Sequence, residues 1–256
     1  MINLTQQDFS LFQVIFVFIA CSTITSFSCL AAERLPHQLG WRDNPIENLT
    51  IFSPPSKCNY CGTSIKFPYL LPVLGFFLAK GRCSNCHRPI LKRYPILELT
   101  GGGGGVFLFI YFGEGNLALW AIGIFLVLLF LSLIDIYEHW LPAIVTYPLF
   151  WVGLTFSPFC TFSEMRIWGA MISFFVMYFS MSVTSMIKRE DVFAGGDIAL
   201  ATAAGAWLGL EVLHLFLLIS SLSFISYALP LRFKGMNYSP MGPALALGFM
   251  ACLFLV

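Results

Sequence analysis

The stretch Ala194-Gly195-Gly196-Asp197 opens an apolar segment that continues to Trp207, and the rest of the chain is organised around it. An ionisable side chain at the end of a membrane helix is costly to keep without a use. Asp135 is its natural partner, because it directly ends another long apolar segment that includes Phe130-Leu131-Ser132-Leu133-Ile134. The residues therefore predict a pair of carboxylates, which the other parts of the chain position or supply with substrate.

The composition indicates an integral membrane protein. Of the 256 residues, 58% are hydrophobic and 11% are charged, whereas a soluble domain carries about 25% charged residues. The formal net charge is +1, so no overall charge points to nucleic acid as a partner.

Eight apolar segments predict an all-α polytopic membrane protein with about eight transmembrane helices. They lie at about 11–32, 95–113, 117–135, 141–158, 167–187, 197–210, 211–229 and 240–256. The sixth and seventh are separated only by Gly209-Leu210-Glu211, so this boundary is the weakest. A signal peptide has basic residues before its apolar segment, but no Lys or Arg precedes the first segment here. We therefore expect an uncleaved first helix.

The basic residues predict the orientation of these helices. Thirteen of the fourteen Lys and Arg residues fall on one side of an eight-span arrangement, and only Arg166 falls on the other. Cytoplasmic loops of membrane proteins carry such an excess of basic residues. We therefore expect both termini outside the cytoplasm, with Asp135 and Asp197 both at the cytoplasmic face.

Four cysteines in the long polar segment 33–94 have the spacing of a metal site. Cys58 and Cys61 form one C-x2-C pair, and Cys83 and Cys86 form a second after 21 intervening residues. Two such pairs can complete a tetrahedral four-cysteine zinc site, which leaves no open position for catalysis. Two disulfides are the alternative, although thiols stay reduced in the cytoplasm. His87 could replace one ligand, and a surface position is the other interpretation.

Two facing carboxylates predict aspartyl protease chemistry. Repulsion between like charges lets one carboxyl keep its proton while the other ionises. The ionised group can activate water, and the protonated group can polarise the carbonyl of a peptide bond. The alternative is that Asp135 is a solvated charge at a helix end. Asp197 fits that alternative less well, because Gly195 and Gly196 leave room for substrate beside it.

The chain resembles the type IV prepilin leader peptidases, bifunctional membrane enzymes of the GxGD aspartyl protease class. The resemblance covers most of the chain and rests on several motifs in one order: Arg34-Leu35-Pro36, the two cysteine pairs, Lys80-Gly81-Arg82-Cys83, Arg93–Glu98 before a glycine run, Leu133-Ile134-Asp135, Leu141-Pro142, Gly196-Asp197 and Gly205-Ala206-Trp207. It implies that Asp135 and Asp197 are the catalytic pair. It also implies prepilin or prepilin-like substrates, N-methylation of the new N-terminus with S-adenosylmethionine, and a bacterial inner membrane with both termini periplasmic.

Three positions depart from the family pattern. Ala194 stands where the motif has its first glycine, Ala143 stands where an acid follows Leu-Pro, and Ala199 stands where a basic residue follows the second catalytic acid. The last departure removes a cation beside the pair, so substrate handling is the property that these departures affect most. The binding residues for S-adenosylmethionine, the particular pilin and the oligomeric state are not assigned from the sequence.

The expected organisation has three parts: a first transmembrane helix at 1–32, a cytoplasmic zinc-binding loop at 33–94 and a transmembrane peptidase core at 95–256. Besides substrate, the expected partner is membrane lipid. Two alternatives stay open. One is a leader peptidase that has lost methylation, and the other is a non-enzymatic zinc-ribbon scaffold or transporter, although a transporter places ionisable residues nearer mid-membrane.

Overall fold

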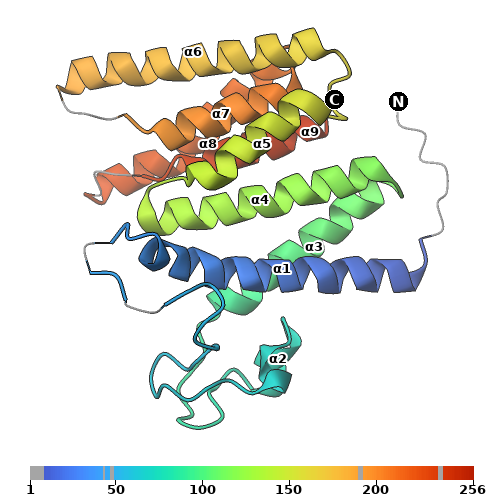
Figure 1. The fold of residues 1–256 in the computed structure, drawn as a ribbon, viewed down its shortest axis with the longest axis vertical. Coiled ribbons are helices and arrows are strands. Elements are labelled where there is room, and N and C mark those ends of the chain that lie inside the picture. Colours follow the sequence, from blue (N-terminus) through green and yellow to red (C-terminus); the bar gives the residue numbers. More distant parts are fainter. Residues whose placement is uncertain (1–8, 43, 47–48, 190–192, 236–238) are drawn as a thin grey trace. The chain divides into compact units, whose positions relative to one another are not determined.

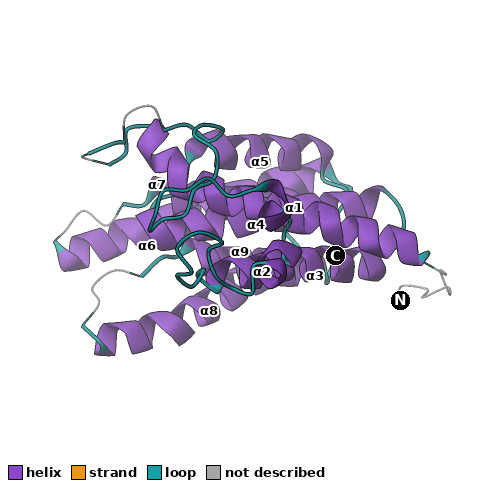
Figure 2. Ribbon diagram, turned by 90° about the horizontal axis from the view of Figure 1, so that it is seen from below, coloured by secondary structure: helices purple, strands orange, loops and turns teal. Residues whose placement is uncertain are grey.

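The computed structural model describes residues 9–42, 44–46, 49–189, 193–235 and 239–256. The described residues are mostly helical, apart from a long loop at 39–92 that contains only a 3-10 turn, one short helix and isolated bridges (Figures 1 and 2). In chain order the elements are α1 (Leu11–Gln38), a 3-10 helix η1 (Phe67–Leu70), α2 (Leu74–Leu78), α3 (Arg93–Phe112), α4 (Asn116–Glu138), α5 (Ala143–Phe156), α6 (Ser163–Lys188), α7 (Gly195–Leu208), α8 (Leu213–Phe233) and α9 (Gly242–Leu253).

Each of the eight apolar segments carries one α-helix, which confirms the predicted fold class. Five of these helices (α1, α3, α4, α6 and α8) are long and apolar enough to cross a membrane. The weak boundary between the sixth and seventh segments is also present. Gly209 follows the last residue of α7 with φ +75°, a left-handed backbone conformation that ends the helix, and α8 begins at Leu213.

Three helices are shorter than a full span. α5 and α7 have 14 residues each and α9 has 12. At 1.5 Å per residue, helices of this length reach only about 20 Å, whereas the hydrocarbon core of a bilayer is about 30 Å thick. The sequence segments assigned to α5 and α9 were longer, because turn residues at their ends are also apolar. The segment assigned to α7, 197–210, has the observed length of 14 residues and lies two positions later.

The chain divides into two compact units, residues 1–126 and 127–256. In the first unit, α1 packs along α3. The glycine run of α3 makes this close approach possible, because a Cβ atom at Gly101, Gly102 or Gly105 would collide with side chains of α1. Small residues of this kind let the backbones of membrane helices approach closely. A Cβ at Gly103 would meet open space.

Arg34 also organises the first unit. It is buried near the end of α1, and its guanidinium donates hydrogen bonds to the carbonyl oxygens of Thr50, Ile51 and Pro54. Loop carbonyls that would otherwise lack donors are thereby satisfied. The motif Arg34-Leu35-Pro36 thus joins the first helix to the loop that follows it.

In the second unit, α7 is the central helix, and it packs against α5, α6 and α9. Its residues from Ile198 to Leu208 are buried almost without exception. The indole N–H of Trp207 donates to the carbonyl of Leu149 at 2.8 Å, and Ser157 Oγ donates to the carbonyl of Trp207 at 2.6 Å. These bonds fix the end of α7 against α5, and so fix the direction in which its first turn points.

The backbones of α6 and α7 approach closely at Gly169 and Gly205. A Cβ on Gly205 would collide with the backbone carbonyl of Gly169, and backbone atoms can withdraw only if the helices separate. We therefore expect Gly205→Ala to lower the thermal unfolding midpoint in detergent, with a loss of stability of about 1–3 kcal/mol.

The matched control for this substitution is Gly123→Ala in α4, where an added Cβ meets nothing within 4 Å. The control should leave the midpoint unchanged or raise it, because alanine favours the helix. Equal midpoints for the two variants, measured by circular dichroism, would contradict the proposed contact.

Candidate active site and metal centre

Asp135 lies in the last turn of α4 and is almost fully buried, with 3% of its surface exposed. Its Oδ2 atom accepts a hydrogen bond from the backbone N–H of Gly242 at 2.6 Å. Gly242 is the first residue of α9, so the carboxyl of one helix satisfies a donor at the start of another. An exposed His139 lies close enough for its charge to act on the same carboxyl.

This contact explains why residue 242 is glycine. α9 has no side-chain cap of its own, and the next residue is Pro243, which has no N–H to donate. The carboxylate of Asp135 takes the place of a cap, where the positive end of the helix dipole favours a negative charge. A Cβ on Gly242 would lie 2.8 Å from Asp135 Oδ2 and 3.0 Å from its Cβ. A larger side chain would therefore push α9 away from the acid.

Asp197 lies in the first turn of α7 with 9% of its surface exposed. No hydrogen bond from a described residue reaches its carboxyl group. The charge of Asp135 acts on Asp197, so the structure brings the two predicted acids together within one compact unit, residues 127–256. Each carboxyl lies at the N-terminal end of a helix. Asp197 lies in the first turn of α7, and the Asp135 carboxyl lies at the start of α9.

The two glycines before Asp197 have different surroundings. A Cβ on Gly196 would lie 2.7 Å from the Cβ of Leu141, so this position packs tightly against the Leu141-Pro142 turn that precedes α5. A Cβ on Gly195 would meet nothing within 4 Å. Gly196 is thus needed for packing, whereas open space remains beside the acid at Gly195.

Tyr227 of α8 belongs to the same surroundings, and sequence reasoning did not find it. Its phenol O–H donates a hydrogen bond to the carbonyl of Pro240, two residues before the start of α9. The charges of Asp135 and Asp197 both act on this phenol. A tyrosine near the end of an apolar segment is typical of a membrane interface, so its sequence context gave no signal of this position.

The four cysteines also come together, in the first unit. Their sulfur atoms all lie within 4.8 Å of one another, with 3.8 Å between Cys58 and Cys86 and 3.9 Å between Cys61 and Cys83. Sulfur atoms at the corners of a tetrahedron around zinc, each about 2.3 Å from the metal, are separated by about 3.8 Å. The four thiols are free, so the cluster fits one metal ion and not two disulfides.

The two cysteine pairs form the same turn twice. A bridge joins Lys57 to Ser64 around the first pair and Arg82 to Pro89 around the second. Gly62 N–H donates to the carbonyl of Cys58, and His87 N–H donates to that of Cys83. His87 therefore occupies the left-handed position that Gly62 has in the first turn, with φ of +57° and +70° respectively. It is an exposed turn residue and lies outside the cluster of possible ligands.

Hydrogen bonds prepare part of this cluster for metal. Those between Thr63 and the Cys61 thiol lower the pKa of Cys61 to about 6. The backbone N–H groups of Cys86 and Asn85 lower the pKa of Cys83. Because the thiolate is the form that binds metal, these bonds favour metal binding at neutral pH.

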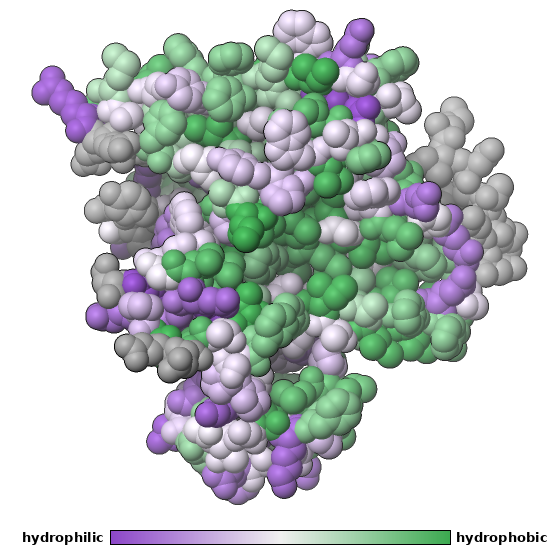
Figure 3. All heavy atoms as spheres, viewed as in Figure 1, coloured by the Kyte–Doolittle hydropathy of each residue, from purple (hydrophilic) through white to green (hydrophobic). Residues whose placement is uncertain are grey.

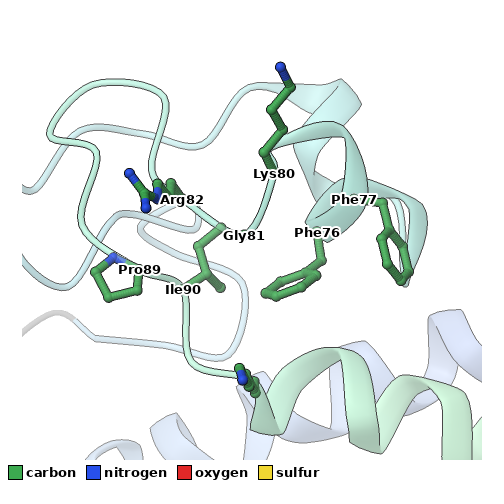
Figure 4. Close-up of a pocket in the computed structure, with 8 residues that line it drawn as sticks. Phe76, Phe77, Lys80, Gly81, Arg82, Pro89 and Ile90 are labelled. Atoms are coloured by element: carbon green, nitrogen blue, oxygen red, sulfur yellow. The ribbon is translucent and has the colours of Figure 1, made fainter.

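A hollow of about 280 Å³ lies beside the metal cluster (Figure 4). Its lining residues are Phe76, Phe77, Lys80, Gly81, Arg82, Pro89, Ile90 and Lys92. The ring of Phe76 points toward Ile90 inside the hollow. The lining has three cations and no acid, so it suits an anion with an apolar part.

Glu98 of α3 is a buried acid whose role is structural. Its carboxylate accepts hydrogen bonds from Ser26 Oγ at 2.6 Å and from the backbone N–H of Val73 at 2.7 Å. Val73 has a left-handed backbone, with φ +61°, which costs energy for a β-branched residue. The bond to Glu98 offsets this cost and holds the start of α2 beside α1 and α3.

Two family models match the chain. The model of the bacterial peptidase A24 N-terminal domain covers residues 19–112, and that of the type IV leader peptidase family covers residues 122–229. The first range includes the four cysteines, and the second includes Asp135 and Asp197. No solved structure matches the chain.

Curated relatives match over most of their length. A protein of Vibrio cholerae named prepilin leader peptidase/N-methyltransferase is 31% identical, over 90% of this chain and 91% of its own. One of Burkholderia pseudomallei with the same name is 33% identical, over 78% of this chain and 67% of its own. A type 4 prepilin-like proteins leader peptide-processing enzyme of Escherichia coli is 29% identical, over 81% and 78%. With these matches, two clustered acids and several membrane-length helices, the chain belongs to the type IV leader peptidase family.

Proposed function

We propose that this membrane protein removes the leader peptide from type IV prepilins or prepilin-like proteins, with Asp135 and Asp197 as its catalytic pair. The observation that carries the proposal is the placement of two buried carboxyls, from helices far apart in the sequence, within reach of each other's charge. Two buried acids, close enough for the charge of one to act on the other, are typical of functional sites. The names of the relatives supply the substrate class.

The surroundings of the two acids assign them different roles. Asp135 accepts the Gly242 N–H at the start of α9, and a donor of this kind favours the ionised carboxylate. Asp197 has no such donor among the described residues and faces the charge of Asp135, which favours its protonated form. Asp135 is therefore the general base, and Asp197 is the general acid.

The reaction follows from these roles. Asp135 takes a proton from a water molecule, whose oxygen attacks the carbonyl carbon of the scissile peptide bond. Asp197 gives its proton to the carbonyl oxygen, so a neutral tetrahedral intermediate forms. When the carbon–nitrogen bond breaks, Asp135 returns the first proton to the leaving amine and Asp197 recovers its own proton from the hydroxyl. Both carboxyls end in their starting states.

The short helices support a site close to the cytoplasmic membrane face. α5 begins just after α4 ends, and α7 and α9 begin at the two acids. Because these helices are too short for a full span, their starting ends can lie below the membrane surface and leave a recess open to water. With both termini periplasmic in a bacterial inner membrane, as the basic residues suggest, the apolar helix of a substrate can stay in the bilayer while its leader enters the recess from the cytoplasm.

We expect Asp135→Asn and Asp197→Asn each to reduce cleavage of a co-expressed prepilin by about a thousandfold or more, because neither an uncharged base nor a non-acidic donor can complete the proton transfers. Cleavage is measured by the mobility shift between precursor and mature pilin. Glu138→Gln is the matched control, since it removes a nearby acid of α4 that lies outside the proposed pair. Normal cleavage by either aspartate variant would refute the assignment.

The role of Gly242 has a separate test. Gly242→Ala should lower cleavage by about 10- to 100-fold, because the new Cβ would displace the N–H that supports the Asp135 carboxylate, and hydrogen bonds to charged groups contribute about 1.5–3 kcal/mol. Gly195→Ala, which adds the same atom in open space beside Asp197, should remain within a few-fold of the unchanged protein. Initial cleavage rates are measured in membranes. A lower rate for Gly195→Ala than for Gly242→Ala would show that the contact with Asp135 is unimportant.

A structural zinc ion is part of the proposal. Cys58, Cys61, Cys83 and Cys86 would hold it, and the ion would supply cross-linking of the two turns and no catalytic chemistry, since four thiolates leave no open position. The organisation proposed is a first transmembrane helix at 1–32, a cytoplasmic zinc-binding loop at 33–94 and a membrane peptidase core at 95–256.

We expect about one zinc ion per chain in the purified protein and its loss in the double variant Cys58→Ser/Cys83→Ser, as measured by elemental mass spectrometry. Because a structural metal contributes directly to folding, the variant should also be cut by protease between residues 57 and 92. Cys160→Ser, which changes a cysteine outside the cluster, should keep the metal. A double variant that retains zinc would rule out these ligands.

Methylation of the new N-terminus, with S-adenosylmethionine as the methyl donor, is the second activity that the names of the relatives support. No residues are assigned to this donor. Mass spectrometry of the mature pilin distinguishes the candidates: an added methyl group supports the bifunctional enzyme, and its absence supports a peptidase alone. A protein that leaves the precursor uncut would favour a non-enzymatic scaffold.

A further inference from the structure

The segment around the metal cluster is strongly basic. Residues 51–97 contain seven Lys and Arg residues and neither Asp nor Glu. Four thiolates around a divalent ion offset only part of this charge. Lys80, Arg82 and Lys92 are exposed, and no described acid forms an ion pair with them. A surface with this charge attracts anions.

The same segment exposes large apolar side chains. The exposed fraction is 61% for Leu74 and 65% for Phe77 of α2, and 75% for Phe67 at the start of η1. Single exposed apolar residues are ordinary. Several of them within twelve residues are typical of a surface that contacts a membrane or another protein. In Figure 3 the lobe that carries α2 shows hydrophobic and hydrophilic residues side by side.

The hollow joins these two properties. The rings of Phe76 and Phe77 and the cations Lys80, Arg82 and Lys92 line one space of about 280 Å³. In Figure 4 the Lys80 side chain extends away from Arg82, so the cations lie around the hollow and can meet separate anionic headgroups, while an apolar chain can cover the ring of Phe76. This arrangement matches a lipid that carries a phosphate, because its charge and its acyl chain are adjacent in the same way.

The position of the segment in the chain selects the membrane as the source of that lipid. Lys92 immediately precedes Arg93, the first residue of the membrane-length helix α3, and Leu78 is only 15 residues before Arg93. The segment is therefore tethered to a bilayer surface, where basic residues meet anionic headgroups at high local concentration.

We propose that Leu74, Phe77, Lys80, Arg82 and Lys92 form a docking face that binds anionic lipid of the membrane in which α3 lies. The two apolar side chains enter the interface, and the three cations hold phosphate headgroups. The zinc-binding segment would thus be fixed on the bilayer surface at a second place besides its helix. This inference is independent of the proposed peptidase activity.

The test uses the full chain in lipid nanodiscs and measures backbone hydrogen exchange of residues 66–82. Nanodiscs of phosphatidylcholine are compared with nanodiscs that also contain phosphatidylglycerol. We expect exchange to be at least about fivefold slower with the anionic lipid, since one cation near such a surface accounts for about that factor, and we expect high salt to remove the difference. Identical exchange in both lipids would overturn the proposal.

A pair of matched variants separates a defined face from general positive charge. Lys80→Gln/Arg82→Gln should abolish the slowing, whereas Lys57→Gln/Arg88→Gln removes the same charges from outside the hollow and should largely keep it. Equal effects of the two double variants would overturn the assignment of the face. Zinc content serves as the check that each variant is folded.

A further double variant tests the apolar side chains of the docking face, and an added prepilin peptide tests whether the face binds protein instead of lipid. Leu74→Ser/Phe77→Ser changes two exposed residues and should weaken protection even with phosphatidylglycerol present. Protection that arises only after a prepilin peptide is added, in either lipid, would show that the face binds protein and would overturn the lipid proposal.

Discussion

The hydrogen bond from Gly242 N–H to Asp135 is the interaction on which the candidate site depends. It joins the end of α4 to the start of α9 across 107 positions of sequence. It supplies an acceptor to a helix that has no cap of its own and a donor to an acid that is almost fully buried. Neither group could be buried alone without a penalty of about 1–3 kcal/mol, and more for the charged one. Tyr227 also helps to fix the start of α9, because its hydrogen bond to the Pro240 carbonyl holds the residues that lead into this helix.

The central position of α7 explains how the second acid is held against the first. Glycine contact with α6 at Gly205 and hydrogen bonds from Trp207 and Ser157 fix the far end of this helix. A rigid helix of 14 residues transmits that placement to its first turn, where Asp197 lies. The acids are therefore positioned by packing at a distance and not by direct bonds between them, which leaves the Asp197 carboxyl available for water and substrate.

The segment that carries the four clustered cysteines is organised by different interactions. Its described residues form only isolated bridges, a single 3-10 turn and one short helix, and they bury few apolar side chains. A segment of this size has too little core to fold by hydrophobic burial alone. Four sulfur atoms at tetrahedral separations, Arg34 on the loop carbonyls and Glu98 on Val73 supply the missing constraints. Large apolar side chains of the segment, such as Leu74 and Phe77, stay exposed.

The sequence by itself determined the membrane class, the eight helical segments, the metal cluster and the two acids, because hydropathy, C-x2-C spacing and acids at the ends of apolar segments are local patterns. Local patterns also placed most helix ends within a few residues, and they overestimated the lengths of α5 and α9, whose flanking turns are apolar too. Only the tertiary structure decided that Gly242 and Tyr227 belong beside the acids, and that His87 is a turn residue. A glycine before a proline at a helix start looks the same whether or not a carboxylate from another helix caps it, since that acceptor comes from a distant part of the chain.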